Sequence, residues 1–401
     1  MTSAIDSKIA ALLPSQTPAR SLTRAFYADA DIFERDLDRI VMRHWLCAGH
    51  QGRIPDPGDF FVVAIGAESV IIVRDQDRCL HAFVNVCRHR GSRICREESG
   101  NLRVFICPYH AWAYNLNGSL RAARDMPPEF DPAALGLKEI HIRLVEGLIF
   151  ISFAATPLRM REAEETLRSG LGPYGWATAK VAHREVYAIE ANWKLAVENY
   201  VECYHCTPSH PEYSRVHSND RPRHKIAELN AAMNARTTAL GFTIPEIDRW
   251  ALQAEAGEEP TWCMRFALTR GAVSGSEDGK PVAPLMGHFT DYDGGSTYVH
   301  VGPLSFFLAY PDYGVIYRFV PKALQRSDLE VTWLVRDDAL EGSGYDTERL
   351  TWMWRITSEA DKRIIEDNQR GVNSRYYVPG PLAGMEAVEQ RFVEWYLHEI
   401  Q

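Results

Sequence analysis

The sequence predicts an α+β protein with an all-β N-terminal domain and a second domain in which a curved antiparallel sheet surrounds a long C-terminal helix (helix-grip type). Its 401 residues exceed the usual size of one domain. Short segments rich in β-branched and aromatic residues, separated by turn signals such as P-D-P-G and N-L-N-G, fill residues 60–153. Beyond Pro157, helical and alternating patterns are mixed, and two helical patterns end the chain.

The patterns divide the chain into a helical leader (residues 1–44), an all-β domain (45–157) and a second domain (158–401). In the leader, apolar residues at helical spacing predict an amphipathic helix over Ala30–His44. The strands predicted in the all-β domain are Phe60–Ile65, Ser69–Arg74, Leu80–Val84, Val104–Cys107, Ala113–Asn115 and Leu148–Phe153.

The second domain mixes both kinds of pattern. Its predicted strands are Lys180–Ile189, Leu304–Tyr310, Gly314–Val320 and Leu329–Val335. Its predicted helices are Arg161–Leu171, Trp193–Cys206, Thr347–Asn368 and Met385–Ile400. Residues 221–302, which contain glycine-rich turns, match neither template clearly, and we leave them unassigned.

The composition narrows the possible functions. A net charge of −9 provides no basic surface, so we expect neither nucleic acid nor a membrane as a partner. No apolar run is long enough to span a bilayer, and the N-terminus is too polar for a secretory signal. The eight cysteines are scattered, which indicates a metal site in a reducing compartment rather than a disulfide framework. We therefore expect a cytoplasmic protein.

Two Cys-His pairs stand in the predicted all-β domain, and they are Cys87-x-His89 and Cys107-x-x-His110. Two thiolates and two imidazoles suit a tetrahedral structural zinc, or a [2Fe–2S] cluster in which two His replace two Cys on one iron. In a zinc ribbon the two Cys usually share one loop, whereas here each loop carries one Cys and one His. This arrangement favours the cluster. The stretch also resembles the cluster loops of Rieske proteins, including Gly91 and Pro108 at its turns.

A second group of metal-binding residues follows about a hundred residues later. On the predicted helix Trp193–Cys206, the spacing places Glu198, Glu202 and His205 on one face. Two His and one carboxylate form the facial triad of non-haem Fe(II) oxygenases.

Two prolines shape the segment after this predicted helix. Pro208 is expected to end the helix, and Pro211 to begin another, so that His210 folds back towards His205. Taken alone, two His five residues apart are more often surface or core residues than ligands. Cys203 and Cys206 form a C-x-x-C pattern, which we interpret as two buried neighbours of the site rather than as a redox or zinc-binding pair.

Over nearly its whole length the chain resembles the oxygenase (α) component of the Rieske non-haem iron ring-hydroxylating oxygenases. The run N-W-K-L-A-V-E-N-Y-V-E-C-Y-H-C-T-P-S-H from Asn192 carries this resemblance together with the Cys-His loops. It implies a Rieske [2Fe–2S] cluster held by Cys87, His89, Cys107 and His110. It also implies a mononuclear Fe(II) held by His205, His210 and an aspartate of the long C-terminal helix. Asp361 matches that aspartate best, and Asp367 is the alternative.

The resemblance also implies a role for Glu202. In the family an acidic residue at this position connects the cluster of one subunit with the iron of the next. His110 of one subunit would then face Glu202 of its neighbour, with His205 behind it. Such contacts require a ring of subunits, a homotrimer or a hexamer. We expect Glu198 and Asn199 to orient the iron ligands.

Ring-hydroxylating dioxygenases usually have Asp where this chain has Glu202. This difference, with the run W-L-V-R-D-D-A-L-E-G-S-G-Y-D, resembles the subgroup that oxidises quaternary ammonium compounds such as betaines and carnitine. The resemblance implies a terminal monooxygenase that receives electrons from NAD(P)H through a separate flavin and iron-sulfur reductase. With O₂ it would hydroxylate an N-methyl group of its substrate, which then releases formaldehyde.

Two alternatives remain at this point. One is a Rieske dioxygenase that dihydroxylates or O-demethylates an aromatic compound. The other is a non-catalytic protein, either a Rieske electron carrier or a zinc-stabilised binding module. A cationic substrate would favour an aromatic cage. Candidates for its rings are Trp262, Phe266, Phe289, Tyr292, Phe306 and Phe307.

Overall fold

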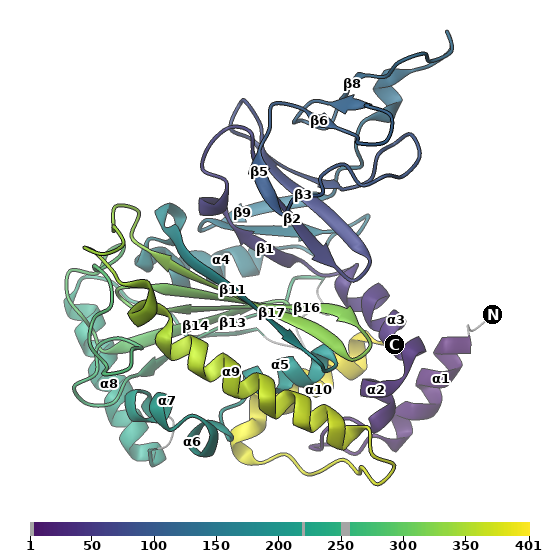
Figure 1. Cartoon of the computed structure of the whole chain (residues 1–401). Coiled ribbons are helices and arrows are strands. Elements are labelled where there is room, and N and C mark those ends of the chain that lie inside the picture. The colour runs from purple at the N-terminus through teal and green to yellow at the C-terminus, as the bar shows by residue number, and fades with distance from the viewer. Residues whose placement is uncertain (1–3, 219–220, 250–256) are drawn as a thin grey trace.

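The computed structural model describes residues 4–218, 221–249 and 257–401 as two units (Figure 1). An N-terminal unit of small sheets lies at the top of Figure 1, and a larger unit built on one long sheet lies below it. The predicted α+β fold class is confirmed. No helix in the described ranges is both long and apolar enough to cross a bilayer.

The N-terminal unit contains three antiparallel sheets. The first has the order β4-β3-β2-β5, with bounds Leu80–Val84, Glu68–Arg74, Asp59–Ile65 and Ser99–Asn101. The second has the order β1-β10-β9, with bounds Leu46–His50, Leu148–Ser152 and His141–Val145. The third has the order β6-β7-β8, with bounds Phe105–Ile106, Ala113–Tyr114 and Leu120–Ala122.

The second unit is organised on a seven-stranded antiparallel sheet. Its order is β11-β17-β16-β15-β14-β13-β12, with bounds Lys180–Ile189, Arg326–Val335, Gly314–Ala323, Ser305–Ala309, Gly295–Val301, Thr261–Ala267 and Ile247–Arg249. Successive side chains of a strand point to opposite faces, so each strand of this sheet contributes to two cores. Phe306 packs in the core shared with α5 and α9, whereas Phe307 packs in the core shared with α4.

The helices cover both faces of this sheet and its end. Their bounds are α1 Ala4–Leu12, α2 Arg24–Ala28, α3 Ala30–Asp36, α4 Arg161–Leu171, α5 Trp193–Val201, α6 Cys206–Ser209, α7 Pro211–Val216, α8 Arg223–Ala239, α9 Thr347–Val372 and α10 Ala387–Glu399. Short 3-10 turns join several of them. The long helix α9 crosses the face opposite to α4, as expected for a helix-grip arrangement (Figure 1).

The N-terminal helices pack against the second unit, although the chain enters the first unit directly after them. Asp36 at the end of α3 is fully buried and forms an ion pair with the buried Lys194 of α5. It also accepts hydrogen bonds from Trp193 Nε1 at 3.1 Å and from the Tyr396 hydroxyl at 2.8 Å. A buried charge is tolerated only when it is paired and hydrogen-bonded in this way. The leader is thereby tied to α5 and α10.

The predicted helix Trp193–Cys206 is wrong in its second half. Helix α5 ends at Val201, and Glu202 has the extended dihedrals φ −121° and ψ 166°. Glu198, Glu202 and His205 therefore do not share one helix face. Pro208 lies inside the short helix α6 instead of ending a longer one, whereas Pro211 begins α7 as predicted.

Other predicted bounds differ less. The helix expected over Ala30–His44 changes to a π-helical turn at Leu37 and ends at Val41. Helix α9 continues four residues beyond the predicted end at Asn368. The predicted C-terminal helix begins with a 3-10 turn, Gly384–Glu386, before α10.

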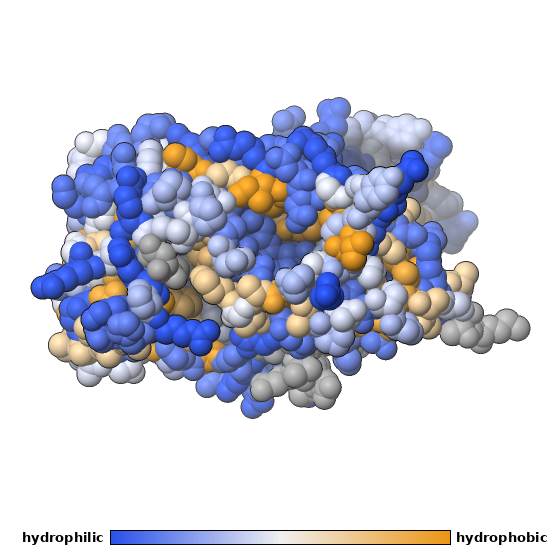
Figure 2. All heavy atoms as spheres, turned by 90° about the horizontal axis from the view of Figure 1, so that it is seen from below, coloured by the Kyte–Doolittle hydropathy of each residue, from blue (hydrophilic) through white to orange (hydrophobic). Residues whose placement is uncertain are grey.

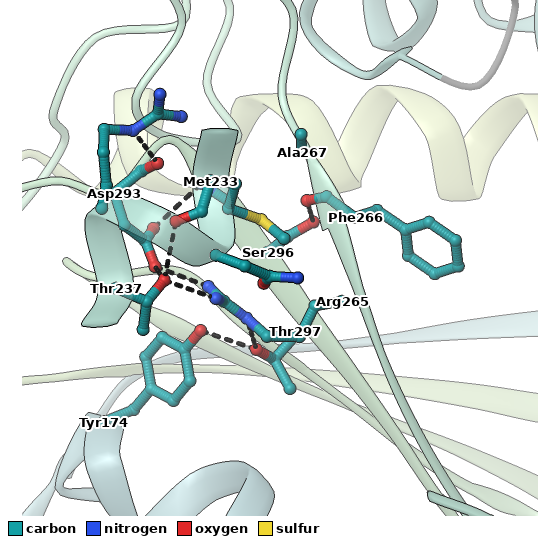
Figure 3. Close-up of polar contacts among 12 residues, drawn as sticks. Tyr174, Met233, Thr237, Arg265, Phe266, Ala267, Asp293, Ser296 and Thr297 are labelled. Carbon is teal, nitrogen blue, oxygen red and sulfur yellow. Dashed lines mark hydrogen bonds and ion pairs between the residues drawn. The ribbon is translucent and has the colours of Figure 1, made fainter. Parts of the chain in front are cut away.

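The unassigned region 221–302 contains α8, β12, β13 and β14, and a buried polar network explains why its pattern is hard to interpret (Figure 3). Arg265 lies in the middle of β13 with only 1% of its surface exposed. It donates to Asp293 Oδ2 at 2.6 Å, to Thr237 Oγ1 at 2.7 Å and to Thr297 Oγ1 at 3.1 Å. The Tyr174 hydroxyl closes the network at 2.7 Å from Thr297 Oγ1. A buried arginine interrupts the apolar alternation by which a strand is recognised.

We predict that Asp293→Asn lowers the free energy of unfolding by about 3–5 kcal/mol, because it leaves the Arg265 guanidinium buried without its counter-charge. Denaturant unfolding followed by circular dichroism measures this change. Asp291→Asn is the matched control, since Asp291 lies two residues away and is exposed. Equal effects of the two substitutions would contradict the importance of the buried ion pair.

Candidate functional site

His205, His210 and Asp361 converge at the face of the large sheet that α9 crosses. One ligand atom from each residue lies within 4.8 Å of the others. Asp361 Oδ1 is 2.8 Å from His210 Nε2 and 3.3 Å from His205 Nε2. Among the described residues, no other group of three or more His, Cys, Asp or Glu donors is as compact.

Each of these side chains is positioned by its local structure. His205 directly precedes α6, and the buried His210 is the residue directly before α7. Asp361 continues the stripe of α9 that includes the buried Trp354, Ser358 and Ile365, so the helical period directs it inwards. The alternative, Asp367, lies outside that stripe, is 72% exposed at its side chain and pairs with Arg370. The structure thus brings Asp361, and not Asp367, to the two histidines.

The electrostatic environment of His205, His210 and Asp361 favours a bound cation. Burial lowers the pKa of His205, but hydrogen bonds to Asp361 and Glu202 outweigh it and raise that pKa to about 9. Burial raises the pKa of Asp361, yet its contacts with His205 and His210 bring it below the ordinary value. The carboxylate therefore attracts positive charge at the point where both imidazole Nε2 atoms meet. Two imidazoles and one carboxylate are the donor set of a facial-triad Fe(II) site, so these residues fit that metal.

Glu202 holds the ring of His205 in place. Its Oε1 is hydrogen-bonded to His205 Nδ1, and its Oε2 accepts from the backbone N–H groups of Tyr204 and His205. Because Nδ1 is engaged by the carboxylate, Nε2 is the nitrogen directed at Asp361. Glu202 meets His205 across a turn, and not across a helix face as the sequence suggested.

The cysteines between these residues differ from the prediction. Cys203 and Cys206 form a disulfide with a Cα–Cα distance of 4.9 Å. Both cysteines do lie next to the site, with Cys206 buried and Cys203 half-buried, but the bond between them was not predicted. The turn that ends α5 and leads to α6 brings the two sulfur atoms together, and the sequence pattern alone did not reveal this turn.

A cleft of about 280 Å³ lies behind Glu202 and His205 and is also lined by Glu198 and Asn199. The Tyr27 hydroxyl donates one hydrogen bond that is shared by the two carboxylate oxygens of Glu198, at 3.0 and 2.9 Å, and burial raises the pKa of Glu198 to about 8. Burial and the proximity of Glu198 raise the pKa of Glu389 in the same cleft to about 9. Glu198 thus anchors the N-terminal helix α2 to α5, and within the described part of the chain no hydrogen bond joins its side chain to His205, His210 or Asp361. Figure 2 views the molecule from below, and this face is mostly hydrophilic with a hollow near its centre.

Aromatic side chains cover the sheet beside the three donors. The Tyr200 ring lies 4.5 Å from Phe306 and 5.0 Å from Tyr317 between centroids. The hydroxyls of Tyr213 and Tyr298 are 3.0 Å apart. The sequence patterns did not indicate the rings of Tyr200, Tyr213, Tyr298, Tyr317 and Trp354. The signal that identifies the strand residues among them is alternation, because Tyr298, Phe306 and Tyr317 occupy inward positions of β14, β15 and β16.

Five of the six aromatic candidates from the sequence divide between the two faces of the sheet, and Tyr292 lies outside both groups. Trp262, Phe266 and Phe306 belong to the inner face, where they contact His300 or Tyr298. Phe289 and Phe307 pack in the opposite core, against Tyr174 and Trp176 respectively, so their selection is wrong. Tyr292 precedes β14, near Asp291 and Asp312.

The two Cys-His loops of the N-terminal unit have the same turn geometry. In the first loop, Gly91 N–H donates to Cys87 O at 3.0 Å. In the second, Ala111 N–H donates to Cys107 O at the same distance. Gly91 and Ala111 adopt the left-handed φ values of +77° and +57° that such turns require. The sequence indicated Gly91 and Pro108 as turn residues, whereas the second left-handed position belongs to Ala111.

The two cysteines and the two histidines of these loops differ in how deeply they are buried. Cys87 and Cys107 are each 2% exposed, whereas His89 and His110 lie at the surface with ring centroids 4.6 Å apart. Their donor atoms do not form one of the compact groups that a single ion needs. A tetrahedral zinc with bonds of about 2.0–2.3 Å would draw all four together. A [2Fe–2S] cluster, with a Cys-ligated iron inside and a His-ligated iron outside, fits this separation.

The two candidate metal sites lie far apart within one chain. The strand β6, between the two Cys-His loops, is near the top of Figure 1. The helices α5, α6 and α7 that carry the His205 and His210 site are near the bottom. The long sheet of the second unit separates them.

Comparisons with known proteins agree with this geometry. The family profile of the Rieske [2Fe-2S] domain matches residues 44–141, and that of the ring hydroxylating alpha subunit (catalytic domain) matches residues 176–401. The chain is 35% identical to the glycine betaine monooxygenase oxygenase subunit of Pseudomonas aeruginosa, over 96% of this chain and 90% of that protein. It is 32% identical to the carnitine monooxygenase oxygenase subunit of Acinetobacter baumannii, over 90% and 87% of the two chains.

Solved structures share the fold at low sequence identity. The quaternary ammonium Rieske monooxygenase CntA superposes with a TM-score of 0.74 at 22% identity, covering 96% of each chain. Naphthalene 1,2-dioxygenase superposes with a TM-score of 0.65 at 19% identity, covering 95% of this chain and 92% of that one. The family matches imply a Rieske cluster and a mononuclear iron, and they exclude the zinc-stabilised module and the simple electron carrier. This chain is an oxygenase that belongs to the Rieske ring-hydroxylating family as its α, or oxygenase, subunit.

Proposed function

We propose that this oxygenase removes an N-methyl group from a quaternary ammonium or betaine-like substrate. The observation that carries the proposal is the cluster of aromatic rings formed by Tyr200, Tyr213, Tyr298 and Tyr317. It lies near the three converging donors, since burial and the nearby charge of Asp361 raise the pKa of both Tyr200 and Tyr317. A methylammonium cation binds to such rings through cation–π attraction, worth about 0.5–2 kcal/mol for each ring. Relatives named as glycine betaine and carnitine monooxygenase oxygenase subunits support the same substrate class.

The metal roles form part of this proposal. His205, His210 and Asp361 would hold the mononuclear Fe(II), and Cys87, His89, Cys107 and His110 would hold the Rieske cluster. The chemistry that the iron supplies when bound is reductive activation of O₂, with single electrons delivered through the cluster. The protein residues hold the donors in place and keep the substrate's methyl group beside them in a site shielded by α9 and the sheet.

In the proposed reaction, one oxygen atom of O₂ is inserted into a C–H bond of the methyl group. The second oxygen atom leaves as water and consumes two electrons and two protons. The hydroxymethyl amine then breaks its C–N bond and gives formaldehyde and the demethylated amine. The electrons would come from NAD(P)H through a separate flavin and iron-sulfur reductase, as expected for an oxygenase subunit of a multicomponent system.

Glu202 would lie on the electron path between the cluster of one subunit and the iron site of the next. Because the Cys-His loops and the His205 site lie at opposite ends of one chain, the shortest electron path would cross from a neighbouring copy. His110 of that copy would approach Glu202, whose carboxylate already holds His205 Nδ1. This arrangement requires a closed ring, and we propose a homotrimer or a pair of trimers. A cytoplasmic location stays a prediction.

Replacing Asp361 with Ala should lower the iron content from about three to about two atoms per chain, because only the mononuclear site loses its anionic ligand. The visible spectrum of the cluster should stay unchanged. Metal analysis and absorption spectroscopy measure both. Asp367→Ala is the control and should keep all the iron, since that carboxylate is exposed and paired with Arg370. Loss of iron in the control, or loss of colour in the Asp361 variant, would refute the assignment.

Glu202→Gln should keep both metals and reduce turnover by about 10- to 100-fold, because the amide cannot hold His205 as the carboxylate does. Rapid-mixing kinetics should locate the loss in oxidation of the reduced cluster. Glu386→Gln removes another carboxylate from the same cleft and should behave like the unmodified enzyme. A cluster that is oxidised at the normal rate in the Glu202 variant would exclude the proposed connection.

A panel of substrates tests the proposed reaction. With a suitable reductase, NADH and O₂, we expect formaldehyde in a one-to-one ratio to the substrate consumed for glycine betaine, carnitine or a related methylammonium compound. Aromatic hydrocarbons and methoxybenzoates form the comparison set. Formation of cis-diols from arenes, without formaldehyde from any betaine, would replace this proposal with an aromatic dioxygenase.

A further inference from the structure

A second cleft, of about 410 Å³, lies at the boundary between the two units, away from the iron donors. Its walls come from β2 and the loop 93–98 of the N-terminal unit and from β11, β16 and β17 of the second unit.

The floor of this cleft contains more positive than negative charge. Glu330 accepts a hydrogen bond from Arg184 Nη2 at 2.7 Å and one from Arg318 Nη1 at 2.9 Å. Arg53 Nη1 lies 3.9 Å from the same carboxylate. The side chains of Arg318 and Arg53 are only 5% and 13% exposed. Three guanidinium groups therefore surround one carboxylate in a largely buried position.

The protonation states of Glu330 and Arg53 leave the floor of the cleft with an excess of positive charge. Burial raises the pKa of Glu330, but Arg318, Arg184 and Arg53 outweigh it and bring that pKa to about 2, so Glu330 is ionised at neutral pH. Burial lowers the pKa of Arg53 to about 10, which still leaves it charged. Charged groups that face this floor from the packed elements are Arg93, Arg96, Glu97, Glu98, Lys322 and Asp328.

Hydrogen-bond donors in the cleft remain unused. Arg184 Nε is buried and has no acceptor among the described residues. Arg53 stacks its guanidinium on Phe61, with a distance of 3.9 Å to the ring centroid. At the rim, Lys322 is paired with Asp328 at 3.4 Å, whereas within the described ranges Arg93 and Arg96 form no ion pair. An unbalanced buried charge is costly, and the fork of a guanidinium matches an oxyanion.

We propose that this cleft binds a small multivalent oxyanion of the phosphate type. The floor guanidiniums of Arg53 and Arg184 would meet it from below, and Arg96 would meet it from the rim loop. Such an anion would join the N-terminal unit, through Arg53 and Arg96, to the second unit, through Arg184. The ligand is a free phosphate or the phosphate of a larger ester, because the cleft is wider than one phosphate.

The rim loop, residues 93–98, is hydrogen-bonded to the segment that leads into the first Cys-His loop. Asn85 accepts hydrogen bonds from the backbone N–H groups of Ile94 and Cys95, both at 2.9 Å, and donates to Cys95 O at 2.7 Å. Asn85 stands two residues before Cys87. An anion that holds Arg96 would therefore stiffen the base of the loop that carries Cys87 and His89.

Thermal unfolding of the metal-loaded full-length protein tests the proposal. Sodium phosphate, compared with sodium chloride at equal ionic strength and pH 7.5, should raise Tm along a saturating curve. The expected rise is about 3 °C at a hundred times Kd. Isothermal titration calorimetry with inorganic phosphate should find one site per chain, and glucose 6-phosphate then distinguishes a free phosphate from an ester. Equal effects of phosphate and chloride would overturn the proposal.

Two exposed residues give variants with opposite expected signs. Arg96→Gln should weaken phosphate binding by about two- to fivefold, because it removes an attractive charge. Glu98→Gln should strengthen it by a similar factor, since Glu98 is 88% exposed, lies 4.0 Å from Arg184 and competes with the anion. Arg121→Gln removes an exposed charge of the same unit outside the cleft and should change nothing. Equal shifts in all three variants, or none in the first two, would refute the site.

Discussion

The structure depends on bringing together three donor atoms that come from two distant segments of the chain. His210 and Asp361 are 151 residues apart in the sequence. No local sequence can do this, because the histidines belong to short helices after α5 and the aspartate belongs to the middle of α9. The large sheet makes it possible. It provides one apolar face on which both α5 and α9 pack, and the stripe of α9 that fits this face also presents Asp361 to the histidines.

The break after Val201 is the local feature that this convergence requires. If α5 had continued to Cys206, the side chain of His205 would have followed the helix and not the turn. Because the chain becomes extended at Glu202, its carboxylate folds onto both the backbone and the ring of His205. One residue thus ends a helix, orients an imidazole and lines the cleft beside the site.

Buried charges hold the elements around this site, and most of them are balanced in place. Asp36 and Lys194 tie the N-terminal helices to α5, and Arg265 and Asp293 tie β13 to the segment before β14. In each case a buried carboxylate is paired with a buried cationic side chain, and neighbouring hydroxyl or indole groups complete the hydrogen bonding. The cleft at Glu330 differs because its positive charges outnumber the negative ones. That contrast identifies it as a place where a ligand can supply the missing charge.

The sequence by itself determined the parts whose chemistry is local. The paired Cys-His loops and the helix start at Pro211 follow from residue types and turn-forming residues over a few positions, and the preference for Asp361 follows from the resemblance to the family. Tertiary structure decided the end of α5 at Val201, the disulfide of Cys203 with Cys206 and the strands of residues 261–301. It also decided which aromatic rings face the site. The physical reason is that a buried Arg265 is stable only with Asp293 28 residues away, and that a strand residue's face depends on register with its neighbours. Neither partner can be recognised until the sheet has placed it.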